Sequence, residues 1–315
     1  CSNESYAELS VFSPKFRYAS NVTELNPPKG KEDNPDPSYM YLHSLEFRFL
    51  EKLTFTLLEG VLVNAPFELR FLNPLMIMHG YASWNDYYGN GNNPEKDVVK
   101  KEASLLGLNL NYVPCPGVKL YFLYAMNQFQ TAYERKNWPD MPIPNAIALQ
   151  GGLDLAFPVA KGYFCADLEG VYATPYMYLM EGSDWSYIRE YDENIGMNNV
   201  REWVGTPFGP DSISAFLSLG YKVPNKWSAK INYIFSAQGE LSNTSVIDTK
   251  YWPTTMDKAT ISAPSGIPQY TNIISLKGLW HVTDKISLEL SPSYVLVCNA
   301  SNQDGVKRQG FEVTA

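Results

Sequence analysis

The chain has 315 residues, and 25 Lys and Arg against 33 Asp and Glu give it a formal net charge of −8. Aromatic residues make up 14% of the chain, which excludes an intrinsically disordered protein, and the acidic balance disfavours binding of nucleic acid through phosphate contacts. No run of about 18 apolar residues is present, so a helical membrane protein is also excluded. A β-rich soluble protein and a transmembrane β-barrel, whose strands are half polar, remain.

The first 38 residues are predicted to be irregular or to hold one or two early strands before Asn26. The prolines of Asn26-Pro27-Pro28-Lys29-Gly30 and Asn34-Pro35-Asp36-Pro37 then interrupt any strand. Cys1 suits the lipidated start of a mature lipoprotein, but a chain that was merely processed or trimmed there is the preferred interpretation. We treat residues 1–315 as a single domain.

Period-2 alternation of apolar and polar residues recurs along the chain, in pairs of runs joined by tight turns. Alternate side chains of a strand lie on opposite faces, so each pair predicts a hairpin with one apolar and one mixed face. Gln309–Ala315 resembles a strand just begun, and we expect further strands beyond it. The predicted pairs are Tyr39–Leu50 with Leu53–Val63, Leu106–Val113 with Val118–Met126, Ile147–Phe157 with a return strand through Leu168, Ile213–Tyr221 with Trp227–Phe235, and Ile274–Trp280 with Ile286–Leu296.

The connections between hairpins are much longer than the turns within them. Tight turns at one end and long loops at the other, with strands of about 9–11 residues, are typical of an outer-membrane barrel. We therefore predict an all-β fold, a transmembrane antiparallel up-and-down β-barrel of about 12–18 strands with long extracellular loops. A soluble β-sandwich is the alternative fold. The long connections are Gly80–Ala103, Phe129–Asn145, Thr174–Asp211 and Gln238–Tyr270.

Charged residues of both signs fall on the strand faces opposite the apolar ones. In a barrel they would line the lumen, whereas in a sandwich they would face solvent. Three of the carboxylates could serve as the acid and base of a glycosidase, but lumen charges balanced by nearby lysines are the preferred interpretation. The predicted lumen-lining residues are Glu46, Arg48, Lys119, Asp154, Asp167, Glu169, Lys222, Lys230, Lys277 and Glu289, and the three carboxylates are Asp154, Asp167 and Glu169.

Residues 43–74 contain a more specific pattern. They read His43-Ser44-Leu45-Glu46-Phe47-Arg48, then Leu53–Glu59, then Glu68-Leu69-Arg70-Phe71-Leu72-Asn73-Pro74. This order resembles the capsule-assembly Wzi-type outer-membrane β-barrel family, in which a His-x-x-Glu strand and a strand ending in Glu precede an aromatic-Leu-Asn-Pro element. The resemblance implies a large monomeric barrel, of about eighteen strands, that binds surface polysaccharide as a lectin.

Catalytic and cofactor-binding patterns are absent from the sequence. Its three histidines, His43, His79 and His281, fall in different hairpins, and no zinc-protease, nucleophile-elbow, phosphate-loop or dinucleotide motif occurs. The four cysteines lack zinc spacing. We therefore expect no catalytic residue, no metal and no cofactor.

Aromatic residues are concentrated in the long loops, beside amides and charged groups. Aromatic faces can stack on sugar rings while neighbouring polar groups bind hydroxyls, although such rings can also hold long loops together. The candidate glycan-binding residues are Trp84, Tyr87, Tyr88, Trp138, Trp185, Trp203 and Trp252.

The sequence thus predicts a monomer in the bacterial outer membrane, in contact with outer-membrane lipid, whose extracellular loops bind or anchor surface polysaccharide without catalysis. A porin or substrate-specific channel for small solutes is the main alternative, because a polar face of both charge signs would leave a wetted path through a barrel with many strands. A secreted carbohydrate-binding sandwich is the third possibility.

Overall fold

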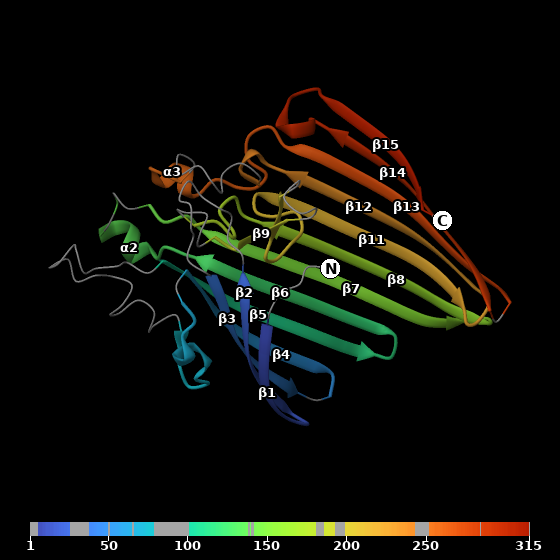
Figure 1. The fold of residues 1–315 in the computed structure, drawn as a ribbon, viewed down its shortest axis with the longest axis horizontal. Coiled ribbons are helices and arrows are strands. Elements are labelled where there is room, and N and C mark those ends of the chain that lie inside the picture. Colours follow the sequence, from blue (N-terminus) through green and yellow to red (C-terminus); the bar gives the residue numbers. More distant parts are fainter. Residues whose placement is uncertain are drawn as a thin grey trace.

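In the computed structural model, thirteen antiparallel strands form one curved sheet in which each strand pairs with its neighbour along the chain, with one exception between β8 and β11 (Figure 1). The structure describes residues 6–25, 38–49, 51–64, 66–78, 101–137, 139, 142–180, 186–192, 199–242, 252–283 and 285–314. This order confirms the predicted all-β, antiparallel, up-and-down arrangement, and the two edge strands, β1 and β15, are not paired with each other in the described residues. It also shows that the sandwich alternative is wrong, because a sandwich would require two facing sheets.

The strands are 8 to 15 residues long in the large sheet. Hydrophobic alternation sets their pairing, because a one-residue slip would move every apolar side chain to the other face. The strands of the large sheet are β1 (Tyr6–Ser13), β2 (Phe16–Leu25), β3 (Ser38–Phe49), β4 (Leu53–Asn64), β5 (Lys101–Cys115), β6 (Val118–Gln128), β7 (Ala146–Val159), β8 (Gly162–Ala173), β11 (Ser212–Val223), β12 (Trp227–Gln238), β13 (Gln269–Thr283), β14 (Ile286–Cys298) and β15 (Lys307–Thr314).

All five predicted hairpins are present, and β1 and β2 are the early strands expected before Asn26. The tight turns gather at one end of the sheet, and the long connections, with their short helices, gather at the other (Figure 1). We call these the turn end and the loop end. The helical segments are η1 (Leu69–Leu72), α2 (Ala132–Asn137), η3 (Glu240–Ser242), α3 (Met256–Ala259) and η6 (Ala300–Asn302).

One long connection has more structure than the sequence indicates. Within Thr174–Asp211, β9 (Ile188–Asp192) and β10 (Asn199–Trp203) pair as a separate two-stranded sheet. Arg189 and Glu202 form an ion pair between them. Two strands of five residues each are too short for the alternation pattern to stand out against loop composition.

The two faces of the large sheet differ in character. One, which we call the apolar face, carries exposed residues such as Leu120, Phe122 and Leu276. Near the turn end this face carries Tyr221, Trp227 and Trp280, with Trp227 directly opposite Trp280. The other, which we call the polar face, carries most of the charged strand residues. No helix in the described residues is long and apolar enough to cross a membrane.

Residues 66–78, which follow β4, fold back onto the apolar face. Phe71 and Met78 pack there against Val22, Tyr41 and Val61, and all five side chains are buried. His43, in the middle of β3, donates a hydrogen bond from Nε2 to the carbonyl of Phe71 over 2.9 Å. The region that carries the Wzi-type resemblance is therefore one packed unit, in which the strand histidine holds the aromatic-Leu-Asn-Pro element.

Candidate functional site: the polar face and the segment that covers it

The ten predicted lumen-lining residues all lie on the polar face. The strand register shows this, because residues directly opposite one another in an antiparallel pair point to the same side. Lys119 is opposite Asp154, and Asp154 is opposite Asp167. Gly220 of β11 extends the assignment from β8 to β12. It is opposite Cys165, which lies on the same face of β8 as Asp167, and it is also opposite Lys230. The other members follow from the same register: Glu46, Arg48, Glu169, Lys222, Lys277 and Glu289.

Most of these charges are paired with an opposite charge on the same face. Each pair is partly exposed, and such pairs stabilise the fold by only about 0–1 kcal/mol each. Their main effect is to keep the face polar with little net charge. The pairs are Arg48–Glu46 at 2.8 Å, Lys119–Asp154 at 3.1 Å, Lys230–Asp167 at 3.8 Å and Lys277–Glu289 at 2.6 Å.

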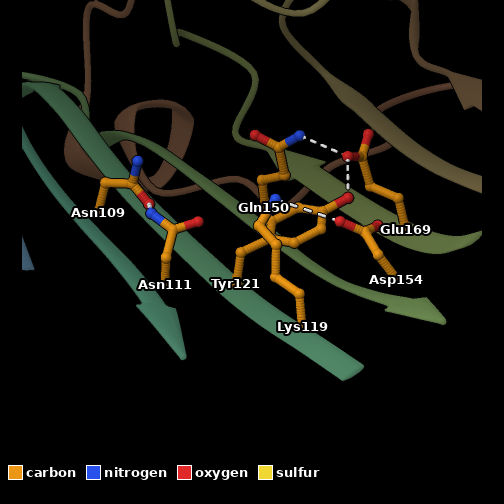
Figure 2. Close-up of polar contacts among 7 residues, drawn as sticks. All are labelled: Asn109, Asn111, Lys119, Tyr121, Gln150, Asp154 and Glu169. Carbon is orange, nitrogen blue, oxygen red and sulfur yellow. Dashed lines mark hydrogen bonds and ion pairs between the residues drawn. The ribbon is translucent and has the colours of Figure 1, made fainter. Parts of the chain in front are cut away.

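Glu169 on β8 is held differently (Figure 2). The Tyr121 hydroxyl donates to Glu169 Oε2 over 2.5 Å, and Gln150 Nε2 donates to the same oxygen over 2.7 Å. Gly152 makes this contact possible, because a Cβ there would lie 2.2 Å from the Tyr121 ring. Two neutral donors therefore hold the Glu169 carboxylate in place. Within the described residues it forms no ion pair with a lysine or arginine.

Near the loop end the polar face becomes apolar, and the connection between β8 and β11 packs on it. We call this connection the covering segment, residues 174–211 as far as the structure describes them. Its residues Met177, Tyr178 and Tyr187 are buried against small apolar residues of five strands. Burying each such large side chain stabilises the fold by about 1.5–3 kcal/mol. The strand residues are Leu25, Leu62, Ala103, Ala148 and Ala173.

Tyr187 anchors the covering segment across the sheet. Its ring is almost completely buried, and its hydroxyl donates to the carbonyl of Ala103 on β5 over 2.7 Å. Burial raises the pKa of Tyr187 above its usual value, so the hydroxyl stays protonated and continues to donate. The covering segment is thus tied to β5, far from β8, the strand that it leaves.

Asp211 closes the covering segment at its other end. The carboxylate accepts hydrogen bonds from the backbone N–H of Ser265 at 2.8 Å, the Ser265 hydroxyl at 2.6 Å and the backbone N–H of Leu241 at 3.1 Å. Its own N–H donates to the carbonyl of Thr174 over 3.0 Å. Burial raises its pKa, while the bonds from Ser265 and Leu241 oppose that rise. Asp211 therefore joins the end of the covering segment to two points of the connection between β12 and β13.

A cavity of about 300 Å³ remains between the covering segment and the polar face. Its floor comes from β6, β7 and β8 and includes Gln150 and Glu169. Its roof comes from Tyr178 and from Gly205, Thr206 and Pro207 of the covering segment. Pockets that bind small ligands typically have volumes of about 300–1,000 Å³, and this cavity lies at the lower end of that range.

Two of the seven predicted glycan-binding residues lie in the described residues, and both pack against tyrosines at the loop end. Trp203 lies 6.3 Å from Tyr178, centroid to centroid, and Trp252 meets Tyr176 edge-on at 6.1 Å. Both tryptophans are partly buried. The other five lie outside the described residues: Trp84, Tyr87, Tyr88, Trp138 and Trp185.

Sequence reasoning missed Tyr176, Tyr178 and Asp211, which organise the loop end. The cluster of tyrosines at 172–178 was a usable signal, because it follows a predicted strand without continuing its alternation. Asp211 offered no signal, since an aspartate before a strand is common in loops. Only the folded arrangement brings Ser265 and Leu241 to it.

Comparison with known proteins supports the fold. No protein-family model and no curated protein matches the chain. Among solved structures it is similar to Wzi, an outer-membrane protein involved in group 1 capsule assembly in Escherichia coli and described as a carbohydrate-binding β-barrel. The identity is 10%, the match covers 95% of this chain and 53% of Wzi, and the TM-score is 0.50. The chain thus spans about half the length of Wzi.

Two further solved structures are also similar in part. A Pseudomonas aeruginosa FadL homologue matches at 11% identity over 99% of this chain and 74% of its own, with a TM-score of 0.31. Pseudomonas aeruginosa OccK8 (OprE) matches at 12% identity over 96% and 75%, with a TM-score of 0.35. The match to Wzi, at the higher TM-score, supports the fold of an outer-membrane β-barrel.

Proposed function

We propose that this protein is a bacterial outer-membrane β-barrel whose loop end binds or anchors surface polysaccharide, without catalysis. The fold and the outward-facing apolar surface support a place in outer-membrane lipid, and we propose that the protein acts there as a monomer. The aromatic rings among the polar groups of the loops support a glycan ligand.

The observation that carries this proposal is the packing of the covering segment. A connection of this length would lose much conformational entropy on binding if it were free. Here Tyr187 holds the segment from within and Asp211 holds its end, so the described part of the loop end is a preorganised surface. Tyrosines pack on Trp203 and Trp252, which leaves each indole held in place and still partly exposed.

Binding of purified protein to an array of bacterial surface polysaccharides tests the proposal. We expect Trp84→Ala, Trp185→Ala and Trp252→Ala, combined in one variant, to lower binding at least tenfold. Trp280→Ala is the matched control, because Trp280 is an exposed indole on the apolar face at the turn end. Absent binding, or equal binding by all variants, would show that the loops are not a glycan site.

A channel for small solutes is the second candidate. The paired charges of the polar face continue toward the turn end beyond the covering segment, and they would make a wetted path in a closed barrel. Conductance in planar bilayers distinguishes the two. Steady open-channel steps would favour the channel, and silence would favour a barrel that the covering segment blocks.

A further inference from the structure

The cavity beneath residues 205–207 contains a carboxylate, that of Glu169, which forms no ion pair with a basic residue in the part of the chain that the structure describes. Of the acidic residues on the polar face from β1 to β14, as far as the structure describes it, Glu169 is the one without a basic partner. The others all form ion pairs: Glu8 with Arg17, Glu46 with Arg48, Asp154 with Lys119, Asp167 with Lys230, and Glu289 with Lys277.

The Glu169 carboxylate also has an unused oxygen. Both of its hydrogen bonds end on Oε2, and Figure 2 shows Oε1 pointing away from Tyr121 and Gln150. The Gln150 side chain donates through its nitrogen, so its amide oxygen is a second acceptor beside the first. Acceptors that face a cavity favour a ligand with donors, and a negative charge among them favours a cationic one.

The rest of the cavity wall is apolar or small. Leu123, Val171 and Pro207 provide apolar contact, and Ala125 and Ala148 leave the space open. A ligand that fits these walls has a compact body with an apolar face and carries its polar groups at one side. A volume of about 300 Å³ accommodates one ring of this kind.

We propose that this cavity is a binding site for a small amine, of the size and shape of one amino-sugar ring, whose ammonium group pairs with Glu169. The site excludes acidic sugars, because their carboxylates would face the Glu169 carboxylate across the cavity. It is distinct from the aromatic loop surface and does not depend on polysaccharide binding by the loops.

Isothermal titration calorimetry on the full chain in detergent tests the site. The titration is run at about pH 6, where the amine of glucosamine is protonated. We expect glucosamine to bind at least tenfold more tightly than glucose, which has the same ring without the charge, and glucuronic acid not to bind. A charge-assisted hydrogen bond accounts for a difference of this size.

Two variants and one control locate the effect. Glu169→Gln keeps the shape of the side chain, and we expect it to remove the preference for glucosamine over glucose. Ala148→Leu fills the cavity without changing any charge, and we expect it to lower glucosamine binding at least tenfold. Asp154→Asn is the control, because it removes a paired carboxylate from the same face outside the cavity, and the preference should stay within about twofold of the original.

Equal affinity for glucosamine and glucose would overturn the proposal, as would a preference that survives Glu169→Gln or full binding by Ala148→Leu. Each variant is first checked for folding by its shift on a heat-modifiability gel. The polysaccharide array judges the loop surface separately. If the protein binds the array but does not prefer glucosamine over glucose, only the cavity proposal is wrong. If it prefers glucosamine but does not bind the array, only the loop proposal is wrong.

Discussion

Gly152 on β7 lies opposite Tyr121 and Glu169, and its missing side chain leaves room for the Tyr121 ring. We expect Gly152→Ala to force the ring aside, to break the hydrogen bond to Glu169, and to destabilise the fold by about 1–3 kcal/mol. Gly151→Ala is the matched control. A Cβ at Gly151 would have its nearest neighbour at 3.8 Å, so that substitution should leave stability unchanged or slightly raised. The stability of both variants is measured as the midpoint temperature of the heat-modifiability transition. Equal midpoints would contradict the role of Gly152.

The raised pKa of Asp211 predicts that the stability of the fold changes with pH. Its pKa is raised in the folded protein, so the folded state holds its proton more tightly than the unfolded chain does. Its contribution to stability is then complete below the ordinary carboxyl pKa, is lost as pH rises through the raised folded pKa, and does not change above it. We expect the wild-type transition temperature to fall over this window relative to Asp211→Asn, which cannot titrate. Asp304→Asn, at an exposed turn, is the control and should follow the wild type.

Asp211→Asn also tests the junction between the covering segment and the connection from β12 to β13. An asparagine offers one acceptor oxygen, whereas the Asp211 carboxylate uses both of its oxygens to bind Ser265 and Leu241. One donor would then face the amide nitrogen, and an unsatisfied buried donor costs about 1–3 kcal/mol. We expect faster proteolysis at residues 239–242 and 260–268 in the variant at neutral pH. Identical cleavage rates would show that Asp211 does not hold the loops.

At the scale of elements, residues 66–78 depend on a strand histidine that lies far away in the sequence. His43→Ala removes the donor to the Phe71 carbonyl, a bond worth about 1 kcal/mol. We expect the segment to open about fivefold more often, so that trypsin cleaves faster after Arg70, which is partly exposed. His281→Ala is the control, because His281 is bonded to Ser287 at the other end of the sheet. Mass spectrometry of the fragments gives the cleavage rate.

The whole molecule presents apolar residues on one face of the large sheet and paired charges on the other. A barrel of this kind resists detergent until it is heated, because its backbone hydrogen bonds are all between strands. We expect the full-length protein to fractionate with membranes and to give a detergent-dependent band that shifts on boiling. A soluble band that does not shift would contradict placement in the membrane.

Much of the candidate site could be predicted from the sequence, and the reason is local. The alternation along each strand assigns Lys119, Asp154 and Glu169 to one face whatever the neighbouring strands are. Their pairing follows once hairpin neighbours are known, because short turns determine the register. The glycan-binding residues in the long loops stay predictions, since loop composition says which residues are present and not where they lie.

The sequence by itself determined the strands, the hairpins and the polarity of each face, because these depend on residues that are close in the chain. Only the tertiary structure decided that the covering segment returns to the polar face and that residues 66–78 pack on the opposite face. It also decided that Glu169 lies in a cavity with no basic partner among the described residues. These features rest on contacts such as that of Tyr187 with Ala103, 84 residues apart. Packing and hydrogen bonding between such distant residues leave no periodic pattern in the sequence.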